Sequence, residues 1–163
     1  MKKQILACAA LALLLLSGCG KQQEVSIPPS EPVVREKTED FIGAGDTELT
    51  EKKGEGAAQT YNKNGEQRVA QRKYDERLFD LNAEVEYFYG DHGTVTEIVA
   101  VFADAPRATI AANITKQLGE PKEKQEETAE TQFRYTWEKD GKTYTLLDPA
   151  NAQPAVIIQQ AQN

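Results

Sequence analysis

The sequence has few of the side chains that most often act as nucleophiles or hold metal ions. It contains two cysteines, Cys8 and Cys19, and one histidine, His92, and beyond Ser30 it has neither serine nor cysteine. Hydrolases of the serine and cysteine types need such a nucleophile beside a histidine, and a zinc site needs three or four ligands. We therefore expect no enzyme activity, no catalytic or metal-binding residues and no cofactor. His92 falls in a predicted turn, where we expect it to be solvated.

The sequence also lacks an apolar run long enough to cross a membrane as a helix. Its longest apolar run, Ile5 to Leu16, has twelve residues, whereas a bilayer core of about 30 Å requires about 20. Lys2 and Lys3 precede this run and small residues follow it, which is typical of a secretory signal peptide. We therefore predict a signal peptide over residues 1–18.

The end of this segment, Leu16-Ser17-Gly18-Cys19, resembles the lipobox of bacterial lipoproteins, in which an apolar residue and two small residues precede a cysteine. The resemblance implies a diacylglyceryl group on the Cys19 sulfur, cleavage before Cys19 by signal peptidase II, and anchoring by fatty acids such as palmitate. Two or more acyl chains hold a protein firmly on a bilayer. We therefore expect a lipid-anchored protein of the cell envelope. Its site would be the outer face of the plasma membrane or, in a Gram-negative host, the outer membrane.

Residues 19–56 are rich in Lys, Gln, Glu, Pro and Gly and poor in apolar residues, which is typical of a flexible linker. Phe41 and Ile42 form an apolar spot that could dock on the folded domain as an added strand or on a partner, but we favour a solvated linker. Removal of the signal peptide takes away Lys2 and Lys3 and no acid, so that the net charge changes from −7 to −9. Nucleic-acid affinity comes from Lys and Arg, so we expect no nucleic-acid partner.

Alternating apolar and polar residues predict strands in the remaining part of the chain. The segment Tyr61–Gly65 indicates a turn, in which Asn64-Gly65 tolerates positive φ. Arg68–Tyr74 is either a strand or the start of a short helix that continues through Leu81. The strands predicted after it are Val85–Tyr89, Thr94–Phe102, Phe133–Trp137, Lys142–Leu147 and Ala155–Gln159, with turns at Gly90–Gly93 and Lys139–Gly141.

One helix is predicted between the second and third of these strands. Asp104 is a candidate cap for its start, and Gly119 marks its end. The charged segment Glu120–Glu130 that follows is predicted to be a solvated loop. Apolar residues repeat every four positions along the helix, at Ile110, Ile114 and Leu118, and Pro106 and Pro121 flank it.

The order of strand, strand, helix and three strands has no βαβ alternation. It predicts fold class α+β over residues 57–163, with a small antiparallel sheet and one helix packed on one face in two layers. Most strand aromatics should then lie in the core. Phe88 and Tyr144 are candidates for a binding patch on the uncovered face.

Residues 107–148 are weakly similar to the small lipoproteins of the SmpA/OmlA (BamE-like) and β-lactamase-inhibitor-like superfamily. The similar motifs are Leu118-Gly119-Glu120-Pro121 at the helix end, Tyr135-Thr136-Trp137, and the turn Lys139-Asp140-Gly141. The chain differs in having a predicted hairpin before the helix where those families have a second helix. The resemblance implies a non-catalytic protein-binding scaffold.

These features favour an envelope lipoprotein that is not an enzyme and whose domain binds another envelope protein. The alternative is a module that binds or senses a small molecule or a cell-wall fragment, which predicts a pocket lined by strand aromatics. A carboxylate-based hydrolase is a third hypothesis and requires two acids facing each other across a cleft. Glu84 and Glu86 alternate with apolar residues and so are more simply the polar face of a strand.

Overall fold

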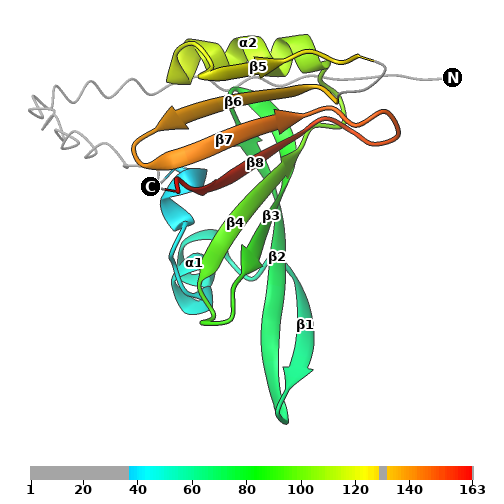
Figure 1. The fold of residues 1–163 in the computed structure, drawn as a ribbon. Coiled ribbons are helices and arrows are strands. Elements are labelled where there is room, and N and C mark those ends of the chain that lie inside the picture. Colours follow the sequence, from blue (N-terminus) through cyan, green and yellow to red (C-terminus); the bar gives the residue numbers. More distant parts are fainter. Residues whose placement is uncertain (1–36, 129–131, 163) are drawn as a thin grey trace, which may run out of the picture. The chain divides into compact units, whose positions relative to one another are not determined.

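The computed structural model describes residues 37–128 and 132–162, which form one antiparallel sheet of eight strands together with short helices (Figure 1). The predicted signal peptide, the lipobox with Cys19, and the expected linker as far as residue 36 lie outside the described residues. Within the described part of the chain, no helix has the length and hydropathy that crossing a bilayer requires.

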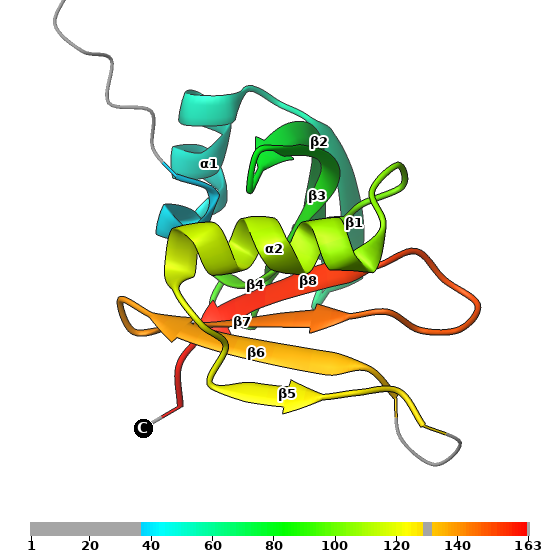
Figure 2. The same cartoon turned by 90° about the horizontal axis from the view of Figure 1, so that it is seen from above.

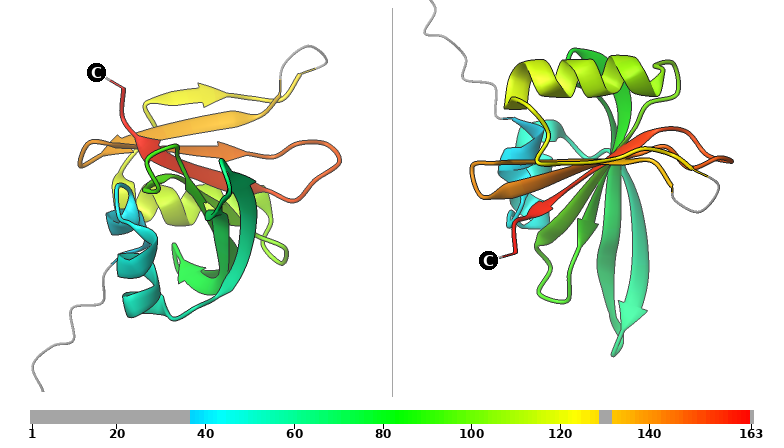
Figure 3. Two further views of the ribbon diagram at one scale, coloured as in Figure 1. Left: turned by 90° about the horizontal axis from the view of Figure 1, so that it is seen from below. Right: turned by 45° about the horizontal axis from the view of Figure 1, so that its top comes forward.

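The strands lie in the order β1-β2-β3-β4-β8-β7-β6-β5, and each pair is antiparallel. The sheet is strongly twisted, so that β1–β4 run in a markedly different direction from β5–β8 (Figure 3). The helical elements are the 3-10 helix η1 (Thr38–Phe41), α1 (Asp46–Lys53) and α2 (Arg107–Leu118). The strands are β1 (Ala57–Lys63), β2 (Glu66–Leu78), β3 (Leu81–Tyr89), β4 (Val95–Val101), β5 (Glu123–Gln125), β6 (Arg134–Lys139), β7 (Lys142–Leu147) and β8 (Ala155–Gln160).

The core is organised by one row of side chains that crosses five adjacent strands. These residues are direct partners in the strand register, and each is at most 2% exposed. Helices α1 and α2 both contribute to the same core cluster, through Leu49 and through Ile110 and Ile114, and both lie on one side of the sheet (Figures 2 and 3). The row consists of Tyr87, Ile98, Ile158, Tyr144 and Trp137.

The predicted fold class, a two-layer α+β fold with one helix on a small sheet, was wrong. The chain is mainly an eight-stranded antiparallel sheet, and its helices are short. Two strands were missed because nothing in their composition marks them: β1 is polar and exposed at six of its seven positions, and β5 lies in a charged segment. Their strand conformation comes from pairing with β2 and β6 and not from burial of their own side chains.

The prediction that residues 19–56 form a solvated linker was also wrong over residues 38–53, which form η1 and α1. Phe41 is 3% exposed and packs edge-on against Tyr87, with ring centroids 6.1 Å apart, and Leu49 is fully buried. Phe41 therefore docks on the domain, as part of a helical turn and not as an added strand. Only a few apolar residues anchor this segment, so that its overall composition still resembles that of a linker.

Several local predictions are confirmed, namely the hairpin turn at Gly90–Gly93, the turn around Asp140-Gly141, and the helix that ends at Gly119. The turn predicted over Tyr61–Gly65 is confined to Asn64 and Gly65, because Tyr61–Lys63 belong to β1. The ambiguous segment after Arg68 is a strand, and Phe79 and Asp80 reverse the chain with positive φ values of 51° and 63°. Asp104 does not cap α2, because Pro106 occupies the N-cap position.

We predict that α1 stabilises the folded domain through Leu49. Leu49→Ala should lower the free energy of unfolding by about 2–5 kcal/mol, because it leaves a cavity at a fully buried site. Urea unfolding followed by circular dichroism measures this change. Glu51→Ala, an exposed position on the same helix, is the control and should change stability by less than about 0.5 kcal/mol. Equal stability of both variants and the wild type would show that α1 is not part of the cooperative fold.

Candidate binding site

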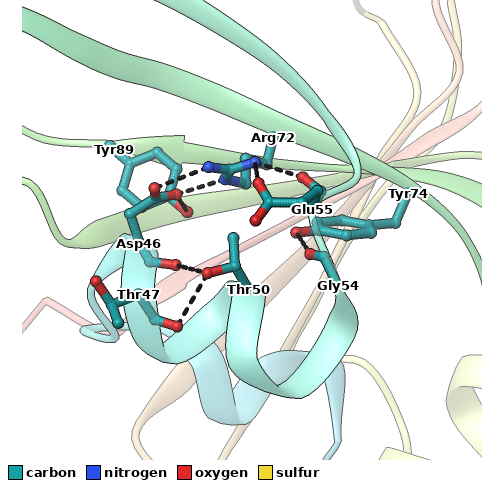
Figure 4. A network of polar contacts seen from close by, with 8 residues as sticks. All are labelled: Asp46, Thr47, Thr50, Gly54, Glu55, Arg72, Tyr74 and Tyr89. Carbon is teal, nitrogen blue, oxygen red and sulfur yellow. Dashed lines mark hydrogen bonds and ion pairs between the residues drawn. The ribbon is translucent and has the colours of Figure 1, made fainter.

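Arg72 in β2 is the most buried charged residue described, with 8% of its surface exposed. Its Nε and Nη2 atoms donate to the two carboxylate oxygens of Asp46, at 2.5 and 2.9 Å, and its Nη1 atom donates to the backbone carbonyl of Glu55 (Figure 4). Such bidentate, charge-assisted contacts are strong and fix geometry. Arg72 therefore holds the first residue of α1 and the segment that leads from α1 into β1.

Two tyrosines extend this cluster on either side of Arg72. The Tyr89 hydroxyl donates to Asp46 Oδ1 at 2.8 Å, and the Tyr74 hydroxyl donates to the Gly54 carbonyl at 2.9 Å (Figure 4). The hydrogen bonds from Arg72 hold the pKa of Asp46 below its usual value of 3.8. Burial and the hydrogen bond to Asp46 raise the pKa of Tyr89. At neutral pH the cluster therefore contains a carboxylate, a guanidinium and neutral phenols.

A cleft of about 320 Å³ lies next to this cluster and opens to solvent. Three structural units contribute to it: the start of α1, the β1–β2 hairpin, and the turn between β3 and β4. We call it the Tyr61 cleft, because Tyr61 is the one large hydrophobic residue in the described ranges that is exposed, at 39%. Its lining includes Asp46, Tyr61, Arg68, Val69, Tyr89 and His92. The ring of Tyr89 is thus held in place by Asp46, while Tyr61 remains accessible.

The cations around the Tyr61 cleft already have acidic neighbours. Lys63 Nζ lies 2.6 Å from Asp91 Oδ1, and Arg68 Nη2 lies 3.2 Å from Glu66 Oε2. Both acids are largely exposed, with side-chain exposures of 81% and 74%, and pairs of this kind contribute little stability. The cleft is therefore aromatic and nearly balanced in charge, which suits contacts with a partner's apolar and hydrogen-bonding groups more than capture of a strong anion.

A second polar cluster lies at the other end of α1. Glu76 accepts hydrogen bonds from the Tyr87 hydroxyl at 2.7 Å, from Thr38 Oγ1 at 2.9 Å and from Lys53 Nζ at 2.8 Å. Lys53 Nζ also lies 4.9 Å from the centre of the Phe41 ring. Burial and the neighbouring Glu76 raise the pKa of Tyr87, so that its hydroxyl stays protonated. Since every polar atom here is satisfied by its neighbours, we interpret this cluster as structural.

The residues singled out from the sequence fall in different places. His92 lines the Tyr61 cleft, and Cys19 lies outside the described residues. Glu84 and Glu86 both pair with Lys73 Nζ, at 2.7 and 2.8 Å, which agrees with their interpretation as the polar face of a strand. In residues 37–128 and 132–162 no group of three or more potential ligands could hold a metal ion.

The prediction that most strand aromatics lie in the core is confirmed. Tyr144, a candidate for the uncovered face, belongs instead to the buried row and is 2% exposed. Phe88 is half-buried, and strand alternation places it on the face opposite to its neighbour Tyr87.

Sequence reasoning missed Asp46, Arg72 and Tyr61, which build the candidate site. One signal was present for α1: acids occupy its first turn and Lys52 and Lys53 its last turn, as the helix dipole favours. Nothing local to Arg72 indicates burial, because its partners Asp46 and Glu55 lie 26 and 17 residues away.

Comparisons with known proteins yield structural likeness only. No family model and no curated protein matches the sequence. One similar structure is a DUF4309 family protein (YjgB) from Bacillus subtilis, with 12% identity, a TM-score of 0.44, and coverage of 71% of this chain and 78% of that one. Another is an extracellular protein containing an SCP domain from Bacillus anthracis, with 10% identity and a TM-score of 0.46. The match covers 78% of this chain and 46% of that protein.

We predict that the Asp46–Arg72 ion pair stabilises the domain at neutral pH. Asp46→Asn should lower the free energy of unfolding by about 1.5–3 kcal/mol, since it removes the carboxylate that faces a buried guanidinium. Asp75→Asn, at an exposed position in β2, is the matched control and should leave stability nearly unchanged.

The same ion pair predicts how this difference depends on pH. The pKa of Asp46 is lower in the folded state than the usual 3.8, so its contribution is complete above that pH and is lost as pH falls further. The difference between wild type and Asp46→Asn in urea midpoint should therefore shrink between pH 7 and about pH 2.5. A difference that stays constant over this range would contradict the assigned ionisation.

Proposed function

We propose that this chain is a lipid-anchored protein of the bacterial cell envelope that binds another envelope protein and catalyses no reaction. The anchor is the acylated Cys19, and the outer face of the plasma membrane, or the outer membrane in a Gram-negative host, is its site. The folded domain supplies the binding surface, for which the Tyr61 cleft is the strongest candidate.

The observation that carries this proposal is that the exposed Tyr61 lies in a cleft beside Tyr89, whose ring is already held in position. Tyr61 is 39% exposed at the cleft rim, and Tyr and Arg are the residues that most often dominate binding energy at protein interfaces. Tyr89 in the wall is fixed by its hydrogen bond to Asp46. A fixed wall reduces the entropy that is lost on binding.

The chemistry of the cleft supports binding more than catalysis. Asp46 is engaged by Arg72 and Tyr89, and its lowered pKa makes it a weak general base. Neither serine nor cysteine occurs beyond Ser30, so His92 has no such side chain to activate in the domain.

The second candidate function is the binding of a small molecule or a cell-wall fragment in the same cleft. Its volume of about 320 Å³ is at the lower end of the range of ligand pockets, about 300–1,000 Å³. Aromatic side chains from β1 and β3 line it, as this alternative requires.

We predict that a photo-crosslinking phenylalanine analogue at position 61 captures one specific envelope protein in growing cells. The substitution keeps an aromatic ring at an exposed site, so that folding should be preserved. The analogue at Phe88, which does not line the cleft, is the matched control and should not capture this protein. Adding Tyr89→Phe, which removes the hydroxyl that donates to Asp46, should reduce capture at position 61.

Two results would decide against a protein partner at this site. Equal capture from positions 61 and 88 would show that the cleft is not the binding surface. No protein adduct at position 61, together with a small-molecule or glycan adduct by mass spectrometry, would favour the second candidate function.

The anchor is tested separately by Cys19→Ala. We expect this variant to leave the membrane fraction or to retain its signal peptide, because the acceptor of the acyl chains is gone. Cys8→Ala is the control, since Cys8 lies within the predicted signal peptide, and should fractionate and mature as the wild type does. Unchanged membrane fractionation and processing of Cys19→Ala would refute lipidation.

A further inference from the structure

The two edges of the sheet differ in how far they are protected from pairing with another strand. The β5 edge has three residues, of which Glu123 and Lys124 are charged, and short, charged edges resist strand addition. The β1 edge has seven residues, and its first six are exposed and uncharged. In the described ranges no strand pairs with the outer side of β1. The backbone groups along that side are therefore available for an additional ladder.

Charges flank the neutral part of β1 with opposite signs at its two ends. Glu55 lies two residues before the strand, and its side chain is 87% exposed. Lys63 ends the strand, and its side chain is 39% exposed. An antiparallel neighbour with this same sequence would bring each Lys63 towards a Glu55. Opposite charges across strands stabilise the pairing and like charges destabilise it.

We propose that β1 pairs antiparallel with β1 of a second copy of this chain, about a two-fold axis at Thr60. This register overlaps all seven residues of the strand and places Lys63 opposite Ala57 of the other copy. Glu55 of that copy precedes its strand by two residues, in the bend before Gly56, so that the long side chains of Lys63 and Glu55 come to the same end of the paired strands. The remaining opposite pairs are Asn62 with Ala58, Tyr61 with Gln59, and Thr60 with Thr60.

The contacts that Lys63 and Glu55 make within one copy are weak enough to be replaced by contacts between two copies. Lys63 pairs with Asp91, whose side chain is 81% exposed, and Glu55 Oε2 lies 3.4 Å from Arg72, whose main partner is Asp46. The exposed Lys63–Asp91 pair is weak, and the exposed Glu55 carboxylate is only a secondary partner of Arg72. The same face on both copies gives a closed, isologous dimer, and its ladder uses backbone atoms of the edge. In this register the Tyr61 side chain lies opposite Gln59 of the other copy, so the second copy borders the Tyr61 cleft.

Reversing the charge of Glu55 or of Lys63 tests both whether β1 is the interface and whether a second copy of the chain is the partner. In Glu55→Lys both symmetric contacts become Lys–Lys, and in Lys63→Glu they become Glu–Glu. A mixture of the two variants restores a Lys–Glu contact at each end of a mixed dimer. Monomer–dimer equilibria are measured by sedimentation on the full-length chain purified in detergent. Lys124→Glu, at the β5 edge, is the control for the change in charge.

We expect the wild type and Lys124→Glu to dimerise alike, and each β1 variant alone to dimerise about tenfold more weakly. The equimolar mixture of Glu55→Lys and Lys63→Glu should regain most of the wild-type affinity, which also shows that both variants are folded. A wild type that stays monomeric, or a mixture no tighter than its components, would overturn the proposal. Capture at position 61 of the second copy alone, with an intact dimer, would instead overturn the proposed function.

Discussion

The ion pair between Arg72 and Asp46 joins three parts of the chain that are distant in the sequence. Arg72 lies in a strand and is almost fully buried, and its partners lie at the start of α1 and just before β1. A buried guanidinium without its carboxylate is strongly destabilising. These hydrogen bonds link the start of α1, the course of the chain into β1 and the orientation of Tyr89.

The other end of α1 repeats this arrangement with the charges reversed. Asp46 and Lys53 are the first and last residues of the helix, about 10 Å apart at 1.5 Å per residue. Their partners Arg72 and Glu76 lie four residues apart on one face of β2, about 13 Å at 3.3 Å per residue. The two helix residues and their two partners on β2 are thus similarly spaced. Because Asp46 pairs with Arg72 and Lys53 with Glu76, both ion pairs can form in only one direction of α1 along β2. The ion pairs thus orient the helix, whereas Leu49 and Phe41 supply its apolar contact.

The sequence predicted the elements whose signals are local and left out those that depend on distant partners. Ile110 and Ile114 mark α2 by their spacing, and Asn64-Gly65 marks a hairpin, because each signal lies within a few residues. The polar strand β1 exists because β2 pairs with it, and α1 is held by residues more than 20 positions away. His92 is distinguished in the sequence only as the sole histidine, and its place beside Tyr61 and Tyr89 follows from the packing of two hairpins.

The position of η1 and α1 at the start of the described chain has a mechanical consequence. A tensile force applied at Lys37 acts first on the Thr38–Glu76 hydrogen bond and on the buried Phe41. It acts next on the backbone hydrogen bonds that join Gly43 and Ala44 to Val95 at the start of β4. It reaches α1 and the Arg72 contacts only after these bonds to β4 have broken. The helical segment therefore bears the first load and extends before the sheet does.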